Sequence, residues 1–375
     1  QDGIRDPLWS RGLGDVYKRQ LVNRVTMWNV AVERQIRVKG PDAEAFTDYV
    51  ITRDATKIEP GNGKYAILCN EKGGVLNDPV LLRLAEDEFW FSISDSDLLL
   101  WLQGVNVSKK YDVIIDEIDV CPVQIQGPLS EDLMAKLAGE ELREIPYYGL
   151  METNIGGADV VISQTGFTGE KGYEIYVRDA HENAELVWNS VLEAGEEFGL
   201  MVIAPAHHRR IAAGILSWGQ DLDHETSPFQ VNLSYQVPRN KEADYIGKEE
   251  LERQRAVIDA GDFPFKMRMV GLTLGGKEIT DYAPDFWLIA DTDGNDMGYV
   301  TSPWWSPELN TNIALGWVPW TSSEVGTKLQ VRLPDEFSET SGVAVDGEVV
   351  DLPFRKSVTP NIREVKKEEG LDYAE

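Results

Sequence analysis

The pattern of apolar residues changes near residue 252, and this change constrains the fold more than any other feature. Before it, strand-like runs are interspersed with helical ones, a mixture that predicts an α/β region over residues 21–255. The strand-like runs include 34–40, 63–70, 158–164 and 173–178, and the longer helical runs are about 181–197 and 205–218. Beyond this change, six short strand-like runs predict a small barrel or sandwich over residues 267–358. These runs are 267–274, 286–291, 297–302, 312–318, 328–333 and 343–353.

The two ends of the chain depart from these patterns. Residues 1–20 follow neither a helical nor a strand period, and coherent patterning begins at Leu21. We expect residues 1–20 to be a non-native segment or, failing that, an irregular N-terminal arm. Residues 359–375 are rich in charged side chains and are expected to form a frayed tail.

Composition excludes several classes of function. The chain has 64 acidic and 36 basic residues, a formal charge of −28, which argues against a nucleic-acid or anionic-membrane partner. Cys69 and Cys121 form no CxxC and the four histidines form no HExxH, so no metal site is predicted. No apolar run reaches the roughly 18 residues that cross a bilayer, and no signal peptide is recognised, which predicts a cytoplasmic protein.

Residues 73–79, Gly-Gly-Val-Leu-Asn-Asp-Pro, place an acidic side chain at the head of an apolar strand. The glycine pair permits a tight turn, and Asn77 and Asp78 follow it. A carboxylate there could orient a cationic or amine group at the mouth of a pocket. The alternative is an ordinary hairpin turn, in which Asn and Asp are favoured in any case.

Residues 165–176, Thr-Gly-Phe-Thr-Gly-Glu-Lys-Gly-Tyr-Glu-Ile-Tyr, combine a glycine-rich turn with a strand. Three glycines within seven residues would let a flat ligand approach the backbone closely. Glu174 lies on one face of the strand, with Tyr173 and Ile175 on the other, and its carboxylate can accept two parallel N–H bonds from a pterin-like edge. The alternative is a hairpin with a charged strand.

A third segment joins Gly-Tyr-Val-Thr-Ser at 298–302, Ser-Pro at 306–307 and Asn-Ile-Ala-Leu-Gly at 312–316, and alone predicts only two strands and a loop. In this order and spacing, the three segments resemble the aminomethyltransferase family, whose best-known member is the glycine-cleavage T-protein. Tyr-Ile-Gly-Lys at 245–248 adds to the resemblance, which covers nearly all of residues 21–354. It implies α/β (α+β) folate-binding domains followed by a C-terminal β-barrel.

The resemblance also implies roles for individual residues. Tetrahydrofolate would be the cofactor, with its N5 accepting the one-carbon group. Glu174 would hold the pterin edge, with Tyr173 or Tyr176 against it, and Arg210, which matches the family's Arg-x-Glu-Ala-Gly segment, is assigned to cofactor binding as well. Asp78 would lie near the reacting centre, where it orients an amine or stabilises positive charge.

The leaving group decides which further residues are required. A sulfonium leaves as a neutral sulfide and needs no general acid, and the cation prefers an aromatic pocket, for which Trp304 or Trp305 are candidates. An aryl ether leaves as phenolate and benefits from an acid such as Tyr235. The tryptophans are equally explained as core and barrel packing.

Four finer segments resemble the tetrahydrofolate-dependent demethylases of the family, which act on dimethylsulfoniopropionate or on aryl methyl ethers. The segments are Trp28–Gln35, Asn77–Val80, Ile93–Asp97 and Gln126–Pro128. In the T-protein the turn carries two aspartates, and here the first is Asn77.

Three hypotheses follow, in descending order. The first is a demethylase that moves a methyl group from a small-molecule donor, a sulfonium ahead of an aryl methyl ether, to tetrahydrofolate. The second is an aminomethyltransferase that acts on a carrier-protein partner, against which Asn77 counts. The third is a non-enzymatic folate-binding protein, whose relatives carry Lys-Gly-Cys-Tyr-x-Gly-Gln where residues 245–249 read Tyr-Ile-Gly-Lys-Glu. The oligomeric state stays open.

Overall fold

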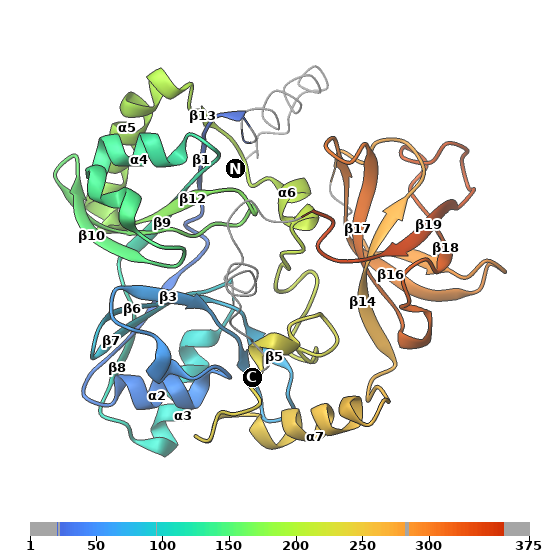
Figure 1. Cartoon of the computed structure of the whole chain (residues 1–375), viewed down its shortest axis with the longest axis horizontal. Helices are drawn as coiled ribbons and strands as arrows, with labels where there is room; N and C mark the ends of the chain where they lie inside the picture. Colours follow the sequence, from blue (N-terminus) through green and yellow to red (C-terminus); the bar gives the residue numbers. More distant parts are fainter. Residues whose placement is uncertain (1–20, 22, 95, 282–284, 356–375) are drawn as a thin grey trace, which may run out of the picture.

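The computed structural model describes residues 21, 23–94, 96–281 and 285–355, so segments 1–20 and 359–375 lie outside the described residues. Figure 1 shows two sheet-containing lobes, one above the other, with a β-barrel beside them. The expected arrangement, an α/β region followed by a C-terminal β-barrel, is confirmed. Within the described part of the chain, no helix is both long and apolar enough to cross a membrane.

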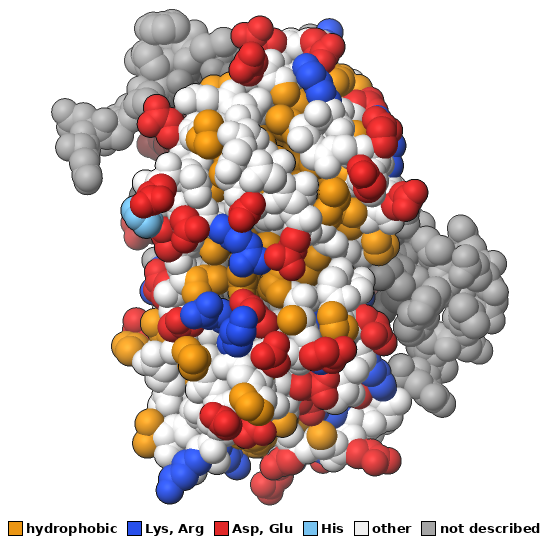
Figure 2. Space-filling view, turned by 90° about the vertical axis from the view of Figure 1, so that its left-hand side faces the viewer, with side chains coloured by type: hydrophobic (Ala, Val, Ile, Leu, Met, Phe, Trp, Pro, Cys, Tyr) orange, Lys and Arg blue, Asp and Glu red, His pale blue; other side chains and the backbone are white. Residues whose placement is uncertain are grey.

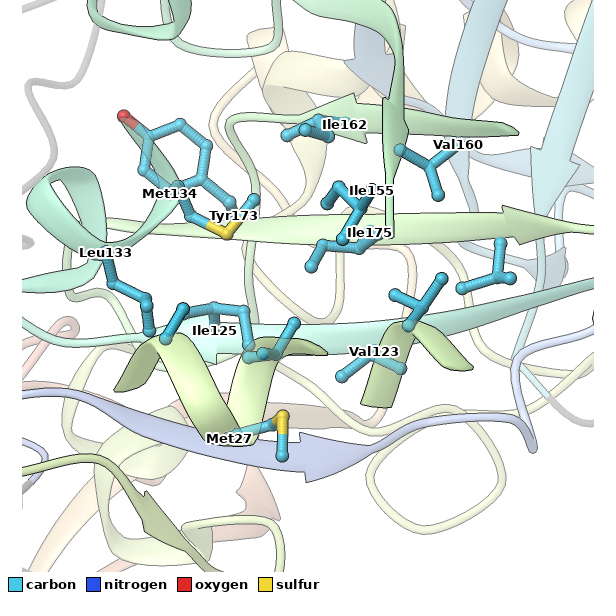
Figure 3. Packing of buried hydrophobic residues seen from close by; sticks show 14 of the residues in the cluster. Met27, Val123, Ile125, Leu133, Met134, Ile155, Val160, Ile162, Tyr173 and Ile175 are labelled. Atoms are coloured by element: carbon cyan, nitrogen blue, oxygen red, sulfur yellow. The ribbon is translucent and has the colours of Figure 1, made fainter. Parts of the chain in front are cut away.

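The first sheet has the strand order β10-β11-β12-β9-β1-β13. Helices α4 (Ser130–Ala138) and α5 (Ala180–Gly195) cover one face, and side chains of both join Ile125 and Ile175 in an apolar core (Figure 3). The strands are β1 (Thr26–Asn29), β9 (Val120–Gln126), β10 (Leu150–Ile155), β11 (Ala158–Ser163), β12 (Gly172–Arg178) and β13 (Met201–Val202).

The second sheet has the order β3-β6-β7-β2-β8, with antiparallel neighbours throughout. Helices α2 (Ala43–Val50) and α3 (Leu98–Lys109) supply Phe46 and Leu102 to its core. The strands are β2 (Gln35–Lys39), β3 (Asn62–Tyr65), β6 (Val80–Ala85), β7 (Glu88–Ser92) and β8 (Ile114–Glu117), and a two-stranded ribbon, β4 (Leu68–Cys69) and β5 (Val75–Asn77), lies beside them.

The two sheets pack against each other through the faces that their helices leave uncovered. Leu82 and Trp90 of the second sheet form an apolar cluster with Val161 and Tyr176 of the first. Because successive side chains of a strand point to opposite faces, Glu174 shares the inter-sheet face with Tyr176. The glycine-rich motif therefore directs its carboxylate toward the second sheet.

The C-terminal region is a closed barrel with the strand order β14-β17-β16-β15-β18-β19. Helix α7 (Lys248–Asp259) precedes it, and a second apolar cluster joins barrel residues such as Leu315 and Trp317 to Ile211 of α6 (His207–Ala212). The strands are β14 (Met267–Leu274), β15 (Trp287–Ala290), β16 (Asp296–Ser306), β17 (Thr311–Pro319), β18 (Lys328–Val331) and β19 (Val345–Val350). Each overlaps a predicted strand.

Two elements differ from the sequence expectation. The helix expected from about 205 to 218 is much shorter, because the chain turns at Gly214, which adopts φ +70°. The run at 63–70, expected as one strand, divides into β3 and β4 in separate sheets. Short 3-10 helices complete the secondary structure: η2 (Ala55–Lys57), η3 (Glu140–Glu144), η4 (Glu196–Phe198), η5 (Ser234–Gln236) and η6 (Trp320–Ser322).

The acidic excess is spread over the surface. Figure 2 shows Asp and Glu side chains over much of one face, with Lys, Arg and apolar side chains among them. This distribution fits a solubilising role for the bulk of the charge.

Candidate active site

Asp78 lies between β5 and β6, where the ribbon leads into the second sheet. Its Oδ2 accepts a hydrogen bond from Tyr65 Oη at 2.9 Å, and its Oδ1 accepts one from Ser94 Oγ at 3.1 Å. The side chain is half-buried. Burial raises the pKa of Asp78 to about 6, although both hydrogen bonds act in the opposite direction. A carboxyl group that titrates near neutral pH is suited to proton transfer.

Asn77, the preceding residue, has a structural role. Its side chain is fully buried, and its Nδ2 donates to Ser94 O and Ser96 Oγ, both at 3.0 Å. The turn before it is tight, because a Cβ on Gly74 would lie 1.9 Å from the carbonyl oxygen of His224. The Gly-Gly-Val-Leu-Asn-Asp-Pro segment is thus both a constrained turn and the support of Asp78.

Tyr65 binds Asp78, and three further tyrosines lie near Tyr65 or near one another. Together they form what we call the central cluster: Tyr65, Asp78, Tyr147, Tyr148 and Tyr235. Burial raises the pKa of Tyr65 well above its usual range, and the nearby Asp78, Tyr235 and Tyr148 add to the effect. The rings of Tyr147 and Tyr148 have centroids 4.5 Å apart. Tyr65, Tyr147 and Tyr148 are half-buried and Tyr235 is 41% exposed, so the cluster keeps accessible aromatic surface.

Tyr148 has an unusual backbone, with φ +67° in the left-handed region that disfavours bulky residues. Its N–H donates to Gln164 O at 3.1 Å, and its carbonyl accepts from Gly63 N at 2.7 Å, so both lobes hold the conformation. Such strained residues persist where the surroundings over-determine them, and they concentrate at functional sites. The strain therefore agrees with a functional role for this part of the molecule.

Glu174 is only 2% exposed, and three protein donors bind its carboxylate. Gln124 Nε2 donates to Oε1, while Thr165 Oγ1 and Tyr176 Oη donate to Oε2. Burial raises the pKa of Glu174, against the effect of these bonds. A carboxylate has about four acceptor sites, so the three donors leave little capacity for a ligand unless some of them rotate away.

The glycines of this motif serve the protein itself. A Cβ on Gly166 would lie 2.1 Å from Gln126 Nε2, and one on Gly172 would lie 2.3 Å from the same side chain. Gln126 in turn accepts a hydrogen bond from Thr168 Oγ1 at 2.8 Å and donates one to Thr165 O at 3.0 Å. The expected close approach of the backbone thus occurs, but at these two glycines the partner is Gln126 rather than a flat ligand.

Tyr173 and Tyr176 lie on opposite faces of β12. Tyr176 is fully buried and donates to Glu174 at 2.9 Å, so it positions that carboxylate. Tyr173 is fully buried on the helix-covered side, where it packs with Met134 and Ile125 (Figure 3). The structure therefore brings Tyr176, and not Tyr173, to Glu174.

Arg210 belongs to a second buried group, which we call the arginine-paired cluster: Arg210, Asp221, Thr301 and Ser302. Arg210 Nη1 lies 2.6 Å from Asp221 Oδ2, and Nη2 donates to Ser302 Oγ at 2.7 Å. Thr301 and Ser302 of β16 also donate to Asp221. Since Arg210 is 1% exposed and its donors are engaged, it positions α6 against the barrel. Its predicted contact with the cofactor stays a prediction.

A further ion-pair group connects the glycine-rich loop to the barrel side. Arg209 pairs with Glu170 of the loop and, at 2.6 Å, with Glu308 of the barrel, and Arg355 pairs with the same two carboxylates. Arg209 and Glu170 are buried. These pairs fix the loop that carries Thr165.

The two candidate tryptophans occupy neighbouring positions on β16. Trp304 is half-buried, and its ring centroid is 5.9 Å from that of His207. Burial and the charge of Arg210 lower the pKa of His207 to about 4, so it is neutral at neutral pH. Trp304 and Tyr65 pack against the same apolar cluster. Trp305 is also half-buried, and as its neighbour in the strand it points to the other face.

Sequence reasoning assigned no role to Glu33, Tyr65, Tyr147 or Tyr148. Glu33 is half-buried near Asp78 and Glu174, and the charges of both raise its pKa. Glu33 lies in one of the segments that resembled the demethylases, which was its only signal. Within the described residues, no group of three or more His, Cys, Asp or Glu side chains is arranged to hold a metal ion.

Comparison with known protein families divides the chain into the same N-terminal α/β region and C-terminal barrel. The sequence model of the GCVT N-terminal domain matches residues 17–241, and that of the glycine cleavage T-protein C-terminal barrel domain matches residues 268–356. A solved structure, the glycine cleavage system aminomethyltransferase T from Bartonella henselae, superposes with a TM-score of 0.77 at 24% identity, over 90% of this chain and 88% of that one. This likeness supports the fold.

Curated relatives include proteins of two activities. The chain is 34% identical over 315 residues to the dimethylsulfoniopropionate demethylase of Ruegeria pomeroyi, covering 84% of this chain and 83% of that protein. It is 30% identical over 341 residues to an aminomethyltransferase of Oceanobacillus iheyensis, covering 88% and 86%. An aminomethyltransferase of Thermotoga maritima is 31% identical over 340 residues, with coverage of 88% and 86%.

Proposed function

Because the chain belongs to the glycine cleavage T-protein family, we propose that it is a tetrahydrofolate-dependent one-carbon transferase whose donor is a small cation, with a methyl sulfonium such as dimethylsulfoniopropionate favoured. The family supports the coarser part of this proposal, folate-dependent transfer of a one-carbon group. The choice of a cationic donor rests on the central cluster.

The observation that carries the choice is a partly accessible carboxylate among aromatic rings. Asp78 is bound by Tyr65 and Ser94, and among the described residues no lysine or arginine forms an ion pair with Asp78, Glu33 or Glu174. A cation is attracted both by carboxylates and by the faces of aromatic rings. The carboxylate and the tyrosines of the central cluster thus favour an onium group over a neutral donor.

The chemistry requires positioning and one proton acceptor. When bound, tetrahydrofolate supplies the nucleophilic nitrogen N5. Transfer would form a bond from N5 to the methyl carbon and break the bond between that carbon and sulfur. The sulfur would keep the electron pair of the broken bond, and N5 would lose its proton. Asp78 is suited to take that proton because its pKa of about 6 lies close to neutral pH. Tyr65 and Ser94 hold its two oxygens in place.

Glu174 supports the folate half of the proposal. It is a buried carboxylate that faces the second sheet, and its donors Thr165 and Tyr176 carry hydroxyl groups that can turn toward a ligand. In this proposal it accepts N–H groups of the pterin. Glu174→Gln keeps the shape but removes the charge, so we expect the affinity for tetrahydrofolate to fall roughly tenfold or more.

An aminomethyltransferase is the second candidate, supported by the activity of the named relatives. It would need an acid pair at the turn, but Asn77 is fully buried and its amide is committed to Ser94 and Ser96. Aryl ether demethylation is the third, and it would use Tyr235, which is 41% exposed beside the cluster, as the acid.

The test is a panel of donors incubated with the protein and tetrahydrofolate. We expect 5-methyl-tetrahydrofolate and the matching thioether from a sulfonium, and less or none from aryl methyl ethers. Product only from an aryl ether would replace the proposed donor class. Formation of 5,10-methylene-tetrahydrofolate from an aminomethylated carrier protein, with no product from the small donors, would favour the aminomethyltransferase.

A further inference from the structure

Glu33 lies in the connection between β1 and β2, where the chain passes from the first sheet to the second. The backbone there is well defined, because Glu33 N donates to Val30 O at 2.8 Å and Glu33 O accepts from Gln35 Nε2 at 2.6 Å. Its side chain is half-buried, and its Oε2 accepts a long hydrogen bond, 3.3 Å, from Ser92 Oγ of β7.

The side chain of Glu33 faces the inside of the molecule. On the outer side, a groove of about 370 Å³ is lined by its neighbours Ala31, Arg34 and Gln35, but Glu33 is not among the lining residues. Arg34 pairs with Glu117 at 3.1 Å and also donates to Ser96 O, and none of its ion pairs within the described residues is with Glu33. The residues that act on the titration of Glu33 belong to the interior instead: Glu174, Ser92 and Asp78.

Glu33 accepts from Ser92 Oγ, Asp78 accepts from Ser94 Oγ two residues further along the chain, and Glu174 accepts from Tyr176 on the face of β12 that is turned to the second sheet. Three carboxylates from three separate segments, Glu33, Asp78 and Glu174, thus lie near one another. Burial raises the pKa of Glu33 well above its usual range, the charges of Glu174 and Asp78 raise it further, and only the bond from Ser92 lowers it. Tyr176, the other titratable group near Glu33, is neutral at neutral pH because its pKa is raised as well. Among the described residues, none of the three carboxylates has a lysine or arginine partner.

Ionising all three carboxylates is unfavourable unless a positive charge binds among them. Like charges at short range disfavour each other's ionised form, and an opposite charge relieves this. Glu174 has three protein donors and Asp78 has two, whereas Glu33 has one long side-chain bond. Of the three carboxylates, Glu33 therefore has the most acceptor capacity left for a ligand.

We propose that Glu33 is a specificity-determining residue of the donor site, which selects a positively charged donor by contacting its onium group. The inference deepens the proposed function, because it assigns a residue to the preference for a cation. Glu33 would bind the positive charge of the donor, Asp78 would accept the proton of N5, and Glu174 would bind the pterin of tetrahydrofolate.

The test compares Glu33→Gln with Glu59→Gln, an exposed residue whose change alters the net charge equally. Binding of tetramethylammonium and of dimethylsulfoniopropionate is measured without tetrahydrofolate, together with binding of the uncharged-sulfur product, 3-methylthiopropionate. We expect Glu33→Gln to weaken binding of both cations about tenfold or more, with little change for the thioether or for tetrahydrofolate. Glu59→Gln should resemble the unaltered protein.

A purely structural role predicts something else. Glu33→Asp keeps the charge, so it should recover part of the cation affinity that Glu33→Gln loses. With a donor that the enzyme demethylates, Glu33→Gln should raise KM far more than it lowers kcat. Equal losses for cation and thioether, a loss for tetrahydrofolate alone, or no binding of either cation by the unaltered protein would overturn the inference. If no sulfonium is demethylated but tetramethylammonium still binds through Glu33, the proposed donor fails and the cation site stands.

Discussion

The molecule contains two clusters of charged side chains in which the carboxylates have different partners: a positive charge in one and only neutral groups in the other. In the arginine-paired cluster, Asp221 lies 2.6 Å from Arg210 and accepts hydrogen bonds from Thr301 and Ser302 as well. In the central cluster, Asp78 has only the hydroxyl groups of Tyr65 and Ser94 as side-chain donors. The two clusters lie near each other, because the charge of Asp221 acts on Asp78, so location alone does not explain the difference.

The partner of a buried carboxylate decides whether the carboxylate stabilises the fold or is available for chemistry. A buried pair is neutral as a whole and connects α6 to β16, and removing one member leaves the other charge uncompensated. A buried carboxylate with neutral partners has a raised pKa and destabilises the fold when it ionises, but it can accept a proton or face a cation. Asp221 also contributes to the raised pKa of Asp78, so the cohesive group affects the reactive one.

Removing Asp221 should give the largest effect on stability. Asp221→Ala leaves the Arg210 guanidinium buried without its carboxylate, so we expect the free energy of unfolding to fall by about 3–5 kcal/mol. Urea denaturation followed by tryptophan fluorescence measures this. Glu225→Ala, at an exposed neighbour, should change the value by no more than about 0.5 kcal/mol. A stable Asp221→Ala protein that has lost turnover would instead place Asp221 in the chemistry.

Asp78→Asn should give the reverse outcome, with activity lost and stability kept. Asparagine has nearly the same shape but cannot take up the proton, so we expect kcat to fall by roughly 10²–10³-fold. The KM for tetrahydrofolate should change little, because Glu174 is unaltered. Steady-state formation of 5-methyl-tetrahydrofolate gives both constants. If Asp78→Asn retained full activity, Asp78 would be only a turn residue.

The same substitution tests the pH dependence of stability. The pKa of Asp78 is about 6 in the folded protein, above the ordinary value near 4, so the folded state binds the proton more tightly. Its contribution to stability is therefore fully present below pH 4 and is lost as the pH rises through 6. The loss amounts to at most about 3 kcal/mol, and Asp78→Asn should not suffer it.

The measurement is the difference in unfolding free energy between the two proteins from pH 4 to pH 7.5. Groups that titrate identically in both cancel in this difference. The asparagine variant should be close to the unaltered protein at pH 4 and should gain on it with rising pH. A difference that stays constant with pH would mean that Asp78 keeps an ordinary pKa.

Local patterns predicted most of the fold. Alternation located β2, β11, β12 and the barrel strands, because each buries one face. Helix α6 was overestimated, since the turn at Gly214 depends on packing against the barrel. β13, with two residues, is too short to show a period.

Site residues were predicted only where they belong to a recognisable sequence motif. Asp78 and Glu174 follow glycine-rich turns, which marked them in the sequence. Glu33, Tyr65 and Tyr148 have no such mark, and they meet Asp78 only because the two sheets pack together, which no local pattern encodes. Gly166 and Gly172 lie against Gln126, which precedes them by 40 and 46 residues in the sequence and so could not be identified as their neighbour from the local pattern.

The smallest expected effect separates the two faces of β12. Tyr176→Phe removes a donor from Glu174, which raises the desolvation penalty of that carboxylate, so we expect a several-fold loss in affinity for tetrahydrofolate. Tyr173→Phe removes a bond of 3.3 Å from Gln164 and a contact with Glu131, both away from Glu174, and should cost about 1 kcal/mol of stability without changing that affinity. Equilibrium binding of tetrahydrofolate to both variants decides the matter. An equal loss of affinity in both variants would mean that packing on either face of β12 affects folate binding. A loss of affinity in Tyr173→Phe alone would reverse the assignment of the two tyrosines.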